Sequence, residues 1–308
     1  MADEPSRPVK LKVSTPADLV ATLPYMFGFK PVDSIIVLAL EGKRVVASAR
    51  IDAGWVDDPE HIQSMLYPIR QHGDHLVVIA WVTPQKAAER AATLVAAALG
   101  GVEQSIIVCG GRCRAGDGPW QPYPDSLPAA EQAGLEVLPS RTAVAAKVKG
   151  PLASDKQATR RWRMARLSVL QHDESWRQAR LDELMTHGLA RPDRLSTYEL
   201  TELAALVHDG QTRDQVWQFM DAERSGKLVA LWQGVVAVVA RAGAPAPLGL
   251  LALSAWLDGE GVLQTCCLER GLRIAPKHSL LRLADQMAMA GLAPKMWPRL
   301  RHSLMRLE

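Results

Sequence analysis

Three short apolar runs in the first half of the chain constrain its fold more than any other feature. They are SIIVLAL (34–40), HLVVIAWV (75–82) and SIIVCGG (105–111). Near-continuous apolar runs of this length, rich in β-branched residues, are typical of strands that are covered on both faces. Segments of helical composition separate the runs, so the sequence predicts crossover connections and a mixed sheet with helices packed on it.

The residues around the first run predict a capped helix before it and a hairpin after it. Thr15 supplies a hydroxyl cap and Pro16 stands at the first helical position, so a helix is expected from here to about Gly28. Residues 41–43 (EGK) form a turn, and RVVASARID (44–52) is expected to pair with the first strand.

The character of the chain changes after Gly150 and Pro151. From residue 155 onward the sequence shows no convincing strand pattern, only helical segments punctuated by Gly, Pro and Asp. We therefore predict an α/β domain over residues 1–150, followed by an all-α domain over residues 151–308.

One stretch of the helical half, residues 252–276, has the register of a tetratricopeptide-like (TPR-like) helical hairpin. Small residues stand where two helices would cross, and a proline follows the second helix. An open peptide-binding array needs several such repeats, and only one good unit is present, so we expect TPR-like geometry within a compact domain. The residues that carry this pattern are Ala255, Gly259, Leu268, Gly271, Leu272 and Pro276.

Composition narrows the class of protein. Of the 308 residues 48% are hydrophobic and 22% are charged, as in a well-packed soluble protein. The net charge of +3 is too small to indicate nucleic-acid binding by itself. The longest apolar run (248–257) is too short to span a bilayer, and four cysteines without framework spacing are expected to stay reduced. We therefore expect a cytoplasmic protein that makes no membrane contact.

Motifs for common chemistries are missing from the sequence. No GxxxxGK[ST] loop, no GxGxxG that opens a helix and no GxSxG elbow occurs. Cys109 and Cys113 have no second Cys or His pair nearby, so no metal and no cofactor are predicted. Thr83, followed by Pro84, offers a generic anion site at a helix N-terminus, although ordinary helix capping explains the same residues. The balance favours a protein that is not an enzyme.

The basic run TRRWRMAR (159–166) is the sharpest electrostatic feature of the sequence. On a helix its arginines and Trp162 could grip phosphates or stack on bases. Trp162, Ala165 and Val169 could equally form a buried stripe and leave the arginines in solvent. The candidates for nucleic-acid contact are Arg160, Arg161, Arg163 and Arg166.

The aromatic residues at the end of the first expected helix also allow two interpretations. Tyr25, Phe27 and Phe29 precede a proline-bounded turn, where they would pin the helix onto the sheet. Alternatively, they would floor a pocket, because strand ends of α/β sheets converge on one rim. The ligand-binding candidates at this rim are Tyr25, Asp33, Ser34, Thr83, Arg112, Ser140 and Arg141.

Several segments resemble the actinobacterial and actinophage family known as domain of unknown function 4192. They are PADLVATLPYMFGFKPVDSIIVLAL (16–40), GLEVLPSRTAVAA (134–146), KLVALWQGVV (227–236) and the helical block 247–292. The resemblance implies an α/β plus helical build and an actinobacterial or phage setting, but no activity. The middle loop GGRCRAGDGPW is short and keeps only Cys113, which weakens any metal or redox role.

The sequence favours a non-catalytic interaction or regulatory protein with a protein partner. The first rival is a small-molecule binder or enzyme that uses the rim, which would need Asp33, Arg112, Ser140 and Arg141 to converge in a closed pocket. The second rival is a nucleic-acid-binding protein, which would need the arginines exposed on one helix face and binding that weakens steeply with salt.

Overall fold

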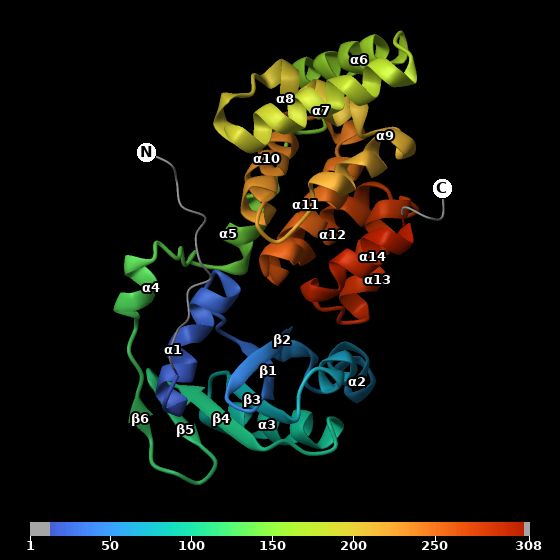
Figure 1. Cartoon of the computed structure of the whole chain (residues 1–308). Helices are drawn as coiled ribbons and strands as arrows, with labels where there is room; N and C mark the ends of the chain where they lie inside the picture. Colours follow the sequence, from blue (N-terminus) through green and yellow to red (C-terminus); the bar gives the residue numbers. More distant parts are fainter. Residues whose placement is uncertain (1–12, 305–308) are drawn as a thin grey trace. The chain divides into compact units, whose positions relative to one another are not determined.

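The computed structural model describes residues 13–304, and their contacts divide them into two compact units. The first unit contains residues 13–140 together with 289–291, and the second contains residues 141–288 and 292–304 (Figure 1). The division falls before the change in composition at Gly150, because the short helix α5 (Arg141–Ala146) already packs with the helical unit.

A six-stranded mixed sheet is the centre of the first unit, with strand order β2-β1-β3-β4-β5-β6. Strands β3 and β4 are parallel and every other neighbouring pair is antiparallel, so the predicted mixed sheet and the β1–β2 hairpin are confirmed. The strands are β1 (Ser34–Glu41), β2 (Arg44–Asp52), β3 (His75–Trp81), β4 (Gln104–Cys109), β5 (Arg112–Ala115) and β6 (Gln121–Pro122).

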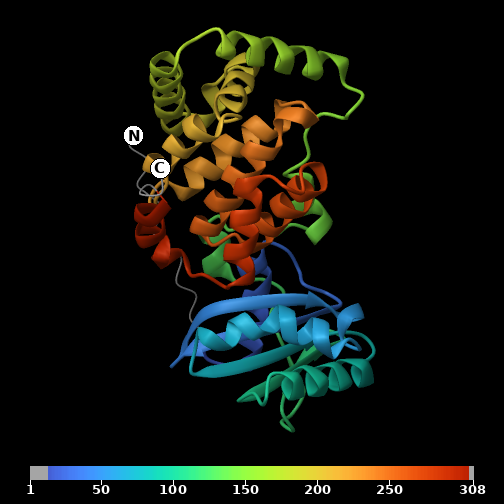
Figure 2. The ribbon, with the colours of Figure 1, turned by 90° about the vertical axis from the view of Figure 1, so that its right-hand side faces the viewer.

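The helices of this unit cover both faces of the sheet. On one face, α2 (Pro59–Leu66) and α3 (Gln85–Ala98) pack side by side against the alternate residues Ile35 and Val37 of β1 (Figure 2). Ile36 and Leu38 face the other way and are also fully buried, as expected for a strand covered on both sides.

Helix α1 (Pro16–Phe27) begins and ends as its sequence predicts. The Thr15 hydroxyl accepts from the Asp18 N–H at 3.1 Å, and the Asp18 carboxylate accepts from the Thr15 N–H at 2.9 Å. Gly28 ends the helix at φ +73°, a conformation that costs glycine little. Beyond β6, a single short helix, α4 (Pro128–Gln132), interrupts the segment that leads to residue 140.

The second unit contains helices and no strand over its described residues. Helix α11 (Pro245–Asp258) is buried from its first residue to Leu257, so the longest apolar run of the sequence lies in the middle of a core. No helix in residues 13–304 has both the length and the apolar character needed to cross a membrane. The other helices are α6 (Lys156–Leu170), α7 (Glu174–Ala190), α8 (Thr197–Leu206), α9 (Gly210–Asp214), α10 (Ser225–Val238), α12 (Gly261–Ile274), α13 (Ser279–Met289) and α14 (Trp297–Leu304).

Helices α11 and α12 form the hairpin that the spacing of small residues predicts. Gly259 turns the chain between them at φ +81°. A Cβ atom on Gly271 would lie 2.5 Å from Cδ2 of Leu281, so this small residue is needed where α13 packs on the hairpin. The tetratricopeptide-like character of the hairpin stays a prediction.

Candidate binding surfaces

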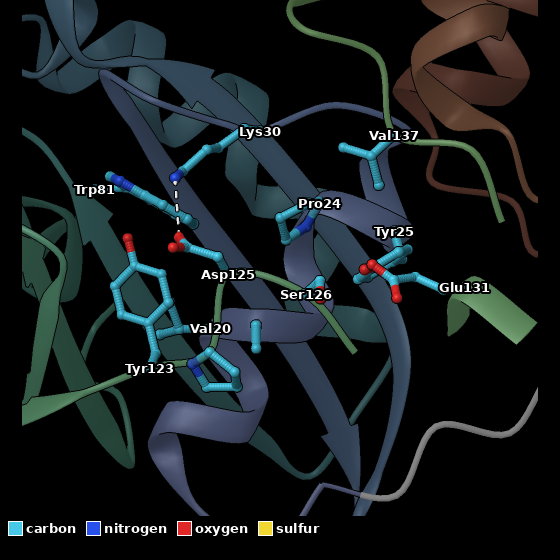
Figure 3. A pocket seen from close by; sticks show the side chains of 12 residues that line it. Val20, Pro24, Tyr25, Lys30, Trp81, Tyr123, Asp125, Ser126, Glu131 and Val137 are labelled. Carbon is cyan, nitrogen blue, oxygen red and sulfur yellow. Dashed lines mark ion pairs between the residues drawn. The ribbon is translucent and has the colours of Figure 1, made fainter. Parts of the chain in front are cut away.

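A cleft of about 230 Å³ opens on the face of the sheet that carries α1 (Figure 3). Helix α1 supplies four lining residues, of which Pro24 and Tyr25 are the last two, and the end of β3 supplies Trp81. Lys30 and the segment 123–137 complete the lining. Segments separated by about a hundred residues in sequence therefore build one concave surface.

Two aromatic rings form a corner at one end of the cleft. The rings of Trp81 and Tyr123 meet edge to face, with centroids 5.5 Å apart and planes at 75°. Trp81 is 7% exposed, so the core fixes the orientation of its ring. Burial, with a further contribution from Asp125, raises the pKa of the Tyr123 hydroxyl above its ordinary value. That hydroxyl is therefore protonated at neutral pH and able to donate a hydrogen bond.

A loose ion pair lies beside this corner. The Lys30 ammonium is 3.7 Å from the Asp125 carboxylate and lies over the Trp81 ring, 5.8 Å from its centroid. The side chains of Lys30 and Asp125 are 47% and 93% exposed, so solvent screens their attraction. Both charges are available to a ligand at little cost.

Tyr25 belongs both to the predicted rim and to the cleft. The backbone N–H of Leu127 donates to the Tyr25 hydroxyl at 3.0 Å, which ties the 123–137 segment to α1. Phe27 and Phe29 are buried, so packing explains these two aromatics. Of the seven rim candidates, only Tyr25 lines the cleft.

The strand register brings Asp33, Ser34, Thr83 and Arg112 to the same end of the strands. Ser34, which follows Asp33, pairs with Trp81, two residues before Thr83. Arg112 starts β5 opposite the last residue of β4. Arg112 is nevertheless three strands from Ser34, or about 14 Å at the usual strand spacing. Its guanidinium donates to the Trp120 carbonyl at 3.0 Å. These residues lie at the same end of the strands but are spread across the width of the sheet.

The polar groups at the start of β1 mostly serve the fold. The fully buried Ser34 hydroxyl accepts from Arg50 Nε at 2.8 Å and donates to the Val32 carbonyl at 2.8 Å. Arg50 also pairs with Asp52 and lies over the Phe29 ring, 5.4 Å from its centroid. This network holds the end of the hairpin against the residues that follow α1.

Asp33, Thr83, Ser140 and Arg141 each have separate surroundings. Asp33 is exposed at φ +48° and its carbonyl accepts from the Ala53 N–H at 2.9 Å. Thr83 is exposed, but the residue at the cap position of α3 is Pro84, without a side-chain cap hydrogen bond, so the expected capping by Thr83 is not seen. Ser140 is exposed, and Arg141 donates to Glu269 of α12 at 2.6 Å.

One local pattern in the sequence indicates the cleft. Tyr123 stands between two prolines and is followed by Asp125 in QPYPD (121–125), within a Gly- and Pro-rich segment that reads as a plain loop. Lys30 and Trp81 carry no such signal, because only the register of β3 brings the Trp81 ring next to Tyr123.

Helix α6 carries the four arginines considered for nucleic-acid contact. Ala158, Trp162, Ala165 and Val169 are buried, which confirms the buried stripe anticipated for this helix. Arg160 and Arg163 are exposed, whereas Arg161 and Arg166 are half-buried. Burial lowers the pKa of the Arg166 guanidinium, and nearby Arg177 adds to this effect while Asp209 opposes it. The arginines therefore do not share one exposed face.

A second apolar stripe runs along the opposite side of α6. Met164, Leu167 and Leu170 are 60%, 58% and 52% exposed. At 100° per residue they lie on the same side of the helix as the exposed cations of its N-terminal half. We call this surface the α6 outer face; it consists of Lys156, Arg160, Arg163, Met164, Leu167 and Leu170.

The described residues offer little for metal or thiol chemistry. No group of three or more His, Cys, Asp or Glu residues within 13–304 could hold a metal ion. Cys113, Cys266 and Cys267 are buried, and desolvation raises the pKa of each thiol, so none of the three is a reactive thiolate at neutral pH.

These features define a mixed α/β unit with a cleft, followed in the chain by a compact helical unit with an exposed apolar stripe on α6. The chain belongs to the family described as Domain of unknown function (DUF4192), whose model matches residues 16–295. The match runs from the first residue of α1 to the residues just before α14. Neither a curated protein nor a solved structure matches the chain.

Proposed function

We propose that this chain is a non-catalytic interaction or regulatory protein, and that its helical unit binds a protein partner through the α6 outer face. The observation that carries the proposal is the exposure of three large apolar side chains, Met164, Leu167 and Leu170, on one side of one helix. The same helix already buries a separate stripe in its own unit. Exposed apolar side chains that gather in this way mark interaction sites more often than scattered ones do.

The spacing of the outer face suits a second helix. Residues 156, 160, 163, 167 and 170 follow alternating steps of four and three, which keeps them on one stripe as in the seam of two packed helices. Full burial of such a side chain is worth about 1.5–3 kcal/mol. Met164, Leu167 and Leu170 are already partly covered, so a partner would gain roughly 1 kcal/mol from each of them.

Charge indicates the kind of helix that fits. Lys156, Arg160 and Arg163 occupy the N-terminal half of the outer face, and the apolar side chains occupy the C-terminal half. An amphipathic partner helix with leucine-like residues at one end and Asp or Glu at the other would match both halves. A nucleic acid would leave the apolar half uncovered, which makes it the poorer fit. The cytoplasmic location is proposed from the composition and the cysteines, and the actinobacterial or actinophage setting from the family resemblance.

Site-specific photo-crosslinking in the full chain tests the proposal. A photoreactive residue replaces Leu167 on the outer face or, as the control, Tyr198, which is 55% exposed on α8. We expect a partner that is captured from position 167 and not from 198. The paired change Met164→Ser and Leu170→Ser should weaken its binding at least tenfold, consistent with about 1.4 kcal/mol per factor of ten.

Two results would contradict this function. Equal capture from positions 167 and 198 would mean that the outer face is not a specific surface. Loss of the captured material after nuclease treatment, with a steep dependence on salt, would move the function to nucleic-acid binding.

A further inference from the structure

The cleft of the α/β unit is a second surface, independent of α6. At about 230 Å³ it is smaller than the cavities of about 300–1,000 Å³ that hold drug-sized ligands. In Figure 3 the Trp81–Tyr123 corner and Tyr25 lie apart, with Pro24 between them. An open cleft whose aromatic residues lie apart suits an extended segment of chain better than a compact metabolite.

The lining has the chemistry that recognises proline. Aromatic side chains form slots in which proline rings pack, and a polyproline II segment enters such slots with little loss of conformational entropy. The edge-to-face pair of Trp81 and Tyr123 provides one aromatic corner, in which Tyr123 is the more exposed ring, and Tyr25 provides a second aromatic contact along α1. The exposed Pro124 adds apolar surface to the lining, and the buried Pro24 contributes to its floor.

The polar groups of the cleft complement a peptide backbone. A polyproline II segment has no internal hydrogen bonds, so its carbonyl groups need donors. The protonated Tyr123 hydroxyl is one donor. The Tyr25 hydroxyl accepts from the Leu127 N–H, so its own proton remains free to be donated.

Charge selects a basic peptide. The cleft contains the carboxylates of Asp125 and Glu131 against one ammonium group, that of Lys30. Asp125 is 93% exposed and 3.7 Å from Lys30, so it can turn toward a cation on the ligand. A guanidinium would match either carboxylate with two parallel hydrogen bonds.

We propose that the cleft binds an extended, proline-rich segment of another protein that carries an arginine or lysine beside its prolines. The Trp81–Tyr123 corner holds a proline ring, the two tyrosine hydroxyl groups donate to peptide carbonyls, and Asp125 or Glu131 pairs with the basic side chain. This ligand is an extended segment with prolines and one basic side chain, whereas the partner proposed for α6 is a helix with acidic side chains.

Fluorescence anisotropy on the full chain tests this inference with three labelled decapeptides. The first is proline-rich with two arginines, the second replaces the arginines by glutamates, and the third replaces the prolines of the first by alanines. We expect the first peptide to bind at least tenfold more tightly than either of the others. Equal binding of all three overturns the inference.

Variants locate the binding in the cleft. Tyr123→Ala should weaken binding of the arginine peptide at least tenfold, and Asp125→Arg, at a highly exposed position that folding does not need, should reverse the preference toward the glutamate peptide. Asp117→Asn, an exposed carboxylate in the β5–β6 turn outside the cleft, is the matched control and should change nothing. If Asp125→Arg still prefers the arginine peptide to the glutamate peptide, the assignment of the peptide site to this cleft is overturned.

Outside the described residues the chain contains a segment of the proposed composition, PSRP at residues 5–8. The double change Pro5→Ala and Pro8→Ala in the full chain should leave the affinity for the arginine peptide unchanged. A tenfold gain in affinity would identify this segment as the occupant and overturn binding of a separate protein. The α6 proposal concerns another unit, so neither outcome affects it.

Discussion

Replacing Gly243 by alanine tests how α6 is held in the helical unit. A Cβ atom at this position would lie 2.6 Å from two carbons of the Trp162 ring and 2.8 Å from a third. Ordinary contacts begin at 3.4 Å, so the ring would have to move by about 0.8 Å. Trp162 is 7% exposed and its ring meets His208 edge to face with centroids 5.4 Å apart, which leaves it little room.

The expected cost follows from this overlap. Overpacking of a well-filled core typically costs about 1–3 kcal/mol, and a rigid indole ring against a backbone position favours the middle of that range, about 2 kcal/mol. With a urea m-value of roughly 2 kcal/mol/M, the midpoint of unfolding should fall by about 1 M. Because Trp162 anchors α6, binding of a partner to the outer face should weaken as well.

Urea unfolding followed by circular dichroism measures the effect. Gly261→Ala is the control, since Gly261 is exposed at the start of α12 and has no atom within 4 Å of the added Cβ. Its stability should stay within about 0.5 kcal/mol of the natural chain. In a Trp162→Leu background, Gly243→Ala should cost much less, because the clashing ring is gone. An unchanged cost in that background, or no cost in the natural chain, would refute the packing explanation.

Three further measurements address polar and thiol groups that are buried or half-buried. Glu202→Gln breaks the ion pair with Arg180, whose atoms are 2.7 Å apart and in which the Glu202 side chain is 6% exposed. The change should lower the free energy of thermal unfolding by roughly 2–3 kcal/mol, below the usual range for buried pairs, because Arg180 keeps Glu183 at 2.8 Å. No loss of stability would mean that the pair is not structural. Burial and, second, the positive charge of Arg213 lower the pKa of His278 below 6.5. The neutral imidazole therefore contributes stability above pH 6.5, and this stability is lost as pH falls through the folded-state pKa. His278→Gln should flatten this slope in urea unfolding, and an unchanged slope would assign it elsewhere. Titration with a thiol reagent should detect only the half-buried Cys109 quickly and all four thiols after denaturation, whereas rapid reaction of Cys266 or Cys267 would contradict the packing of α12.

The parts of the fold that were predicted are those with local signals. The Thr15 cap and Gly28 fixed both ends of α1, because each satisfies or releases backbone groups within a few residues. The apolar runs located β1, β3 and β4 for the same reason. Strands β5 and β6 were missed, since both are short and their composition carries no strand signal. Strand β5 is defined by its pairing with β4, and β6, at the edge of the sheet, by its pairing with β5.

The candidate site depended on contacts that no local pattern records. The Tyr25 hydroxyl and the Leu127 N–H are 102 residues apart in sequence, yet their hydrogen bond ties the segment beside the cleft to α1. Asp33, Ser34 and Arg112 were expected near one another because strand ends converge on a rim. The register brings them to the same end of the strands, but the strand order places them on different strands across the sheet.

Helix α6 separates most clearly what the sequence determines from what the tertiary structure decides. Its sequence determined a helix with arginines and two apolar stripes, one through Trp162 and Val169 and the other through Leu167 and Leu170. Both stripes have helical periodicity, so periodicity alone could not tell which one enters the core. The tertiary structure decided, because Gly243 leaves a space that fits the Trp162 ring and no corresponding seat covers Leu167 or Leu170 among the described residues.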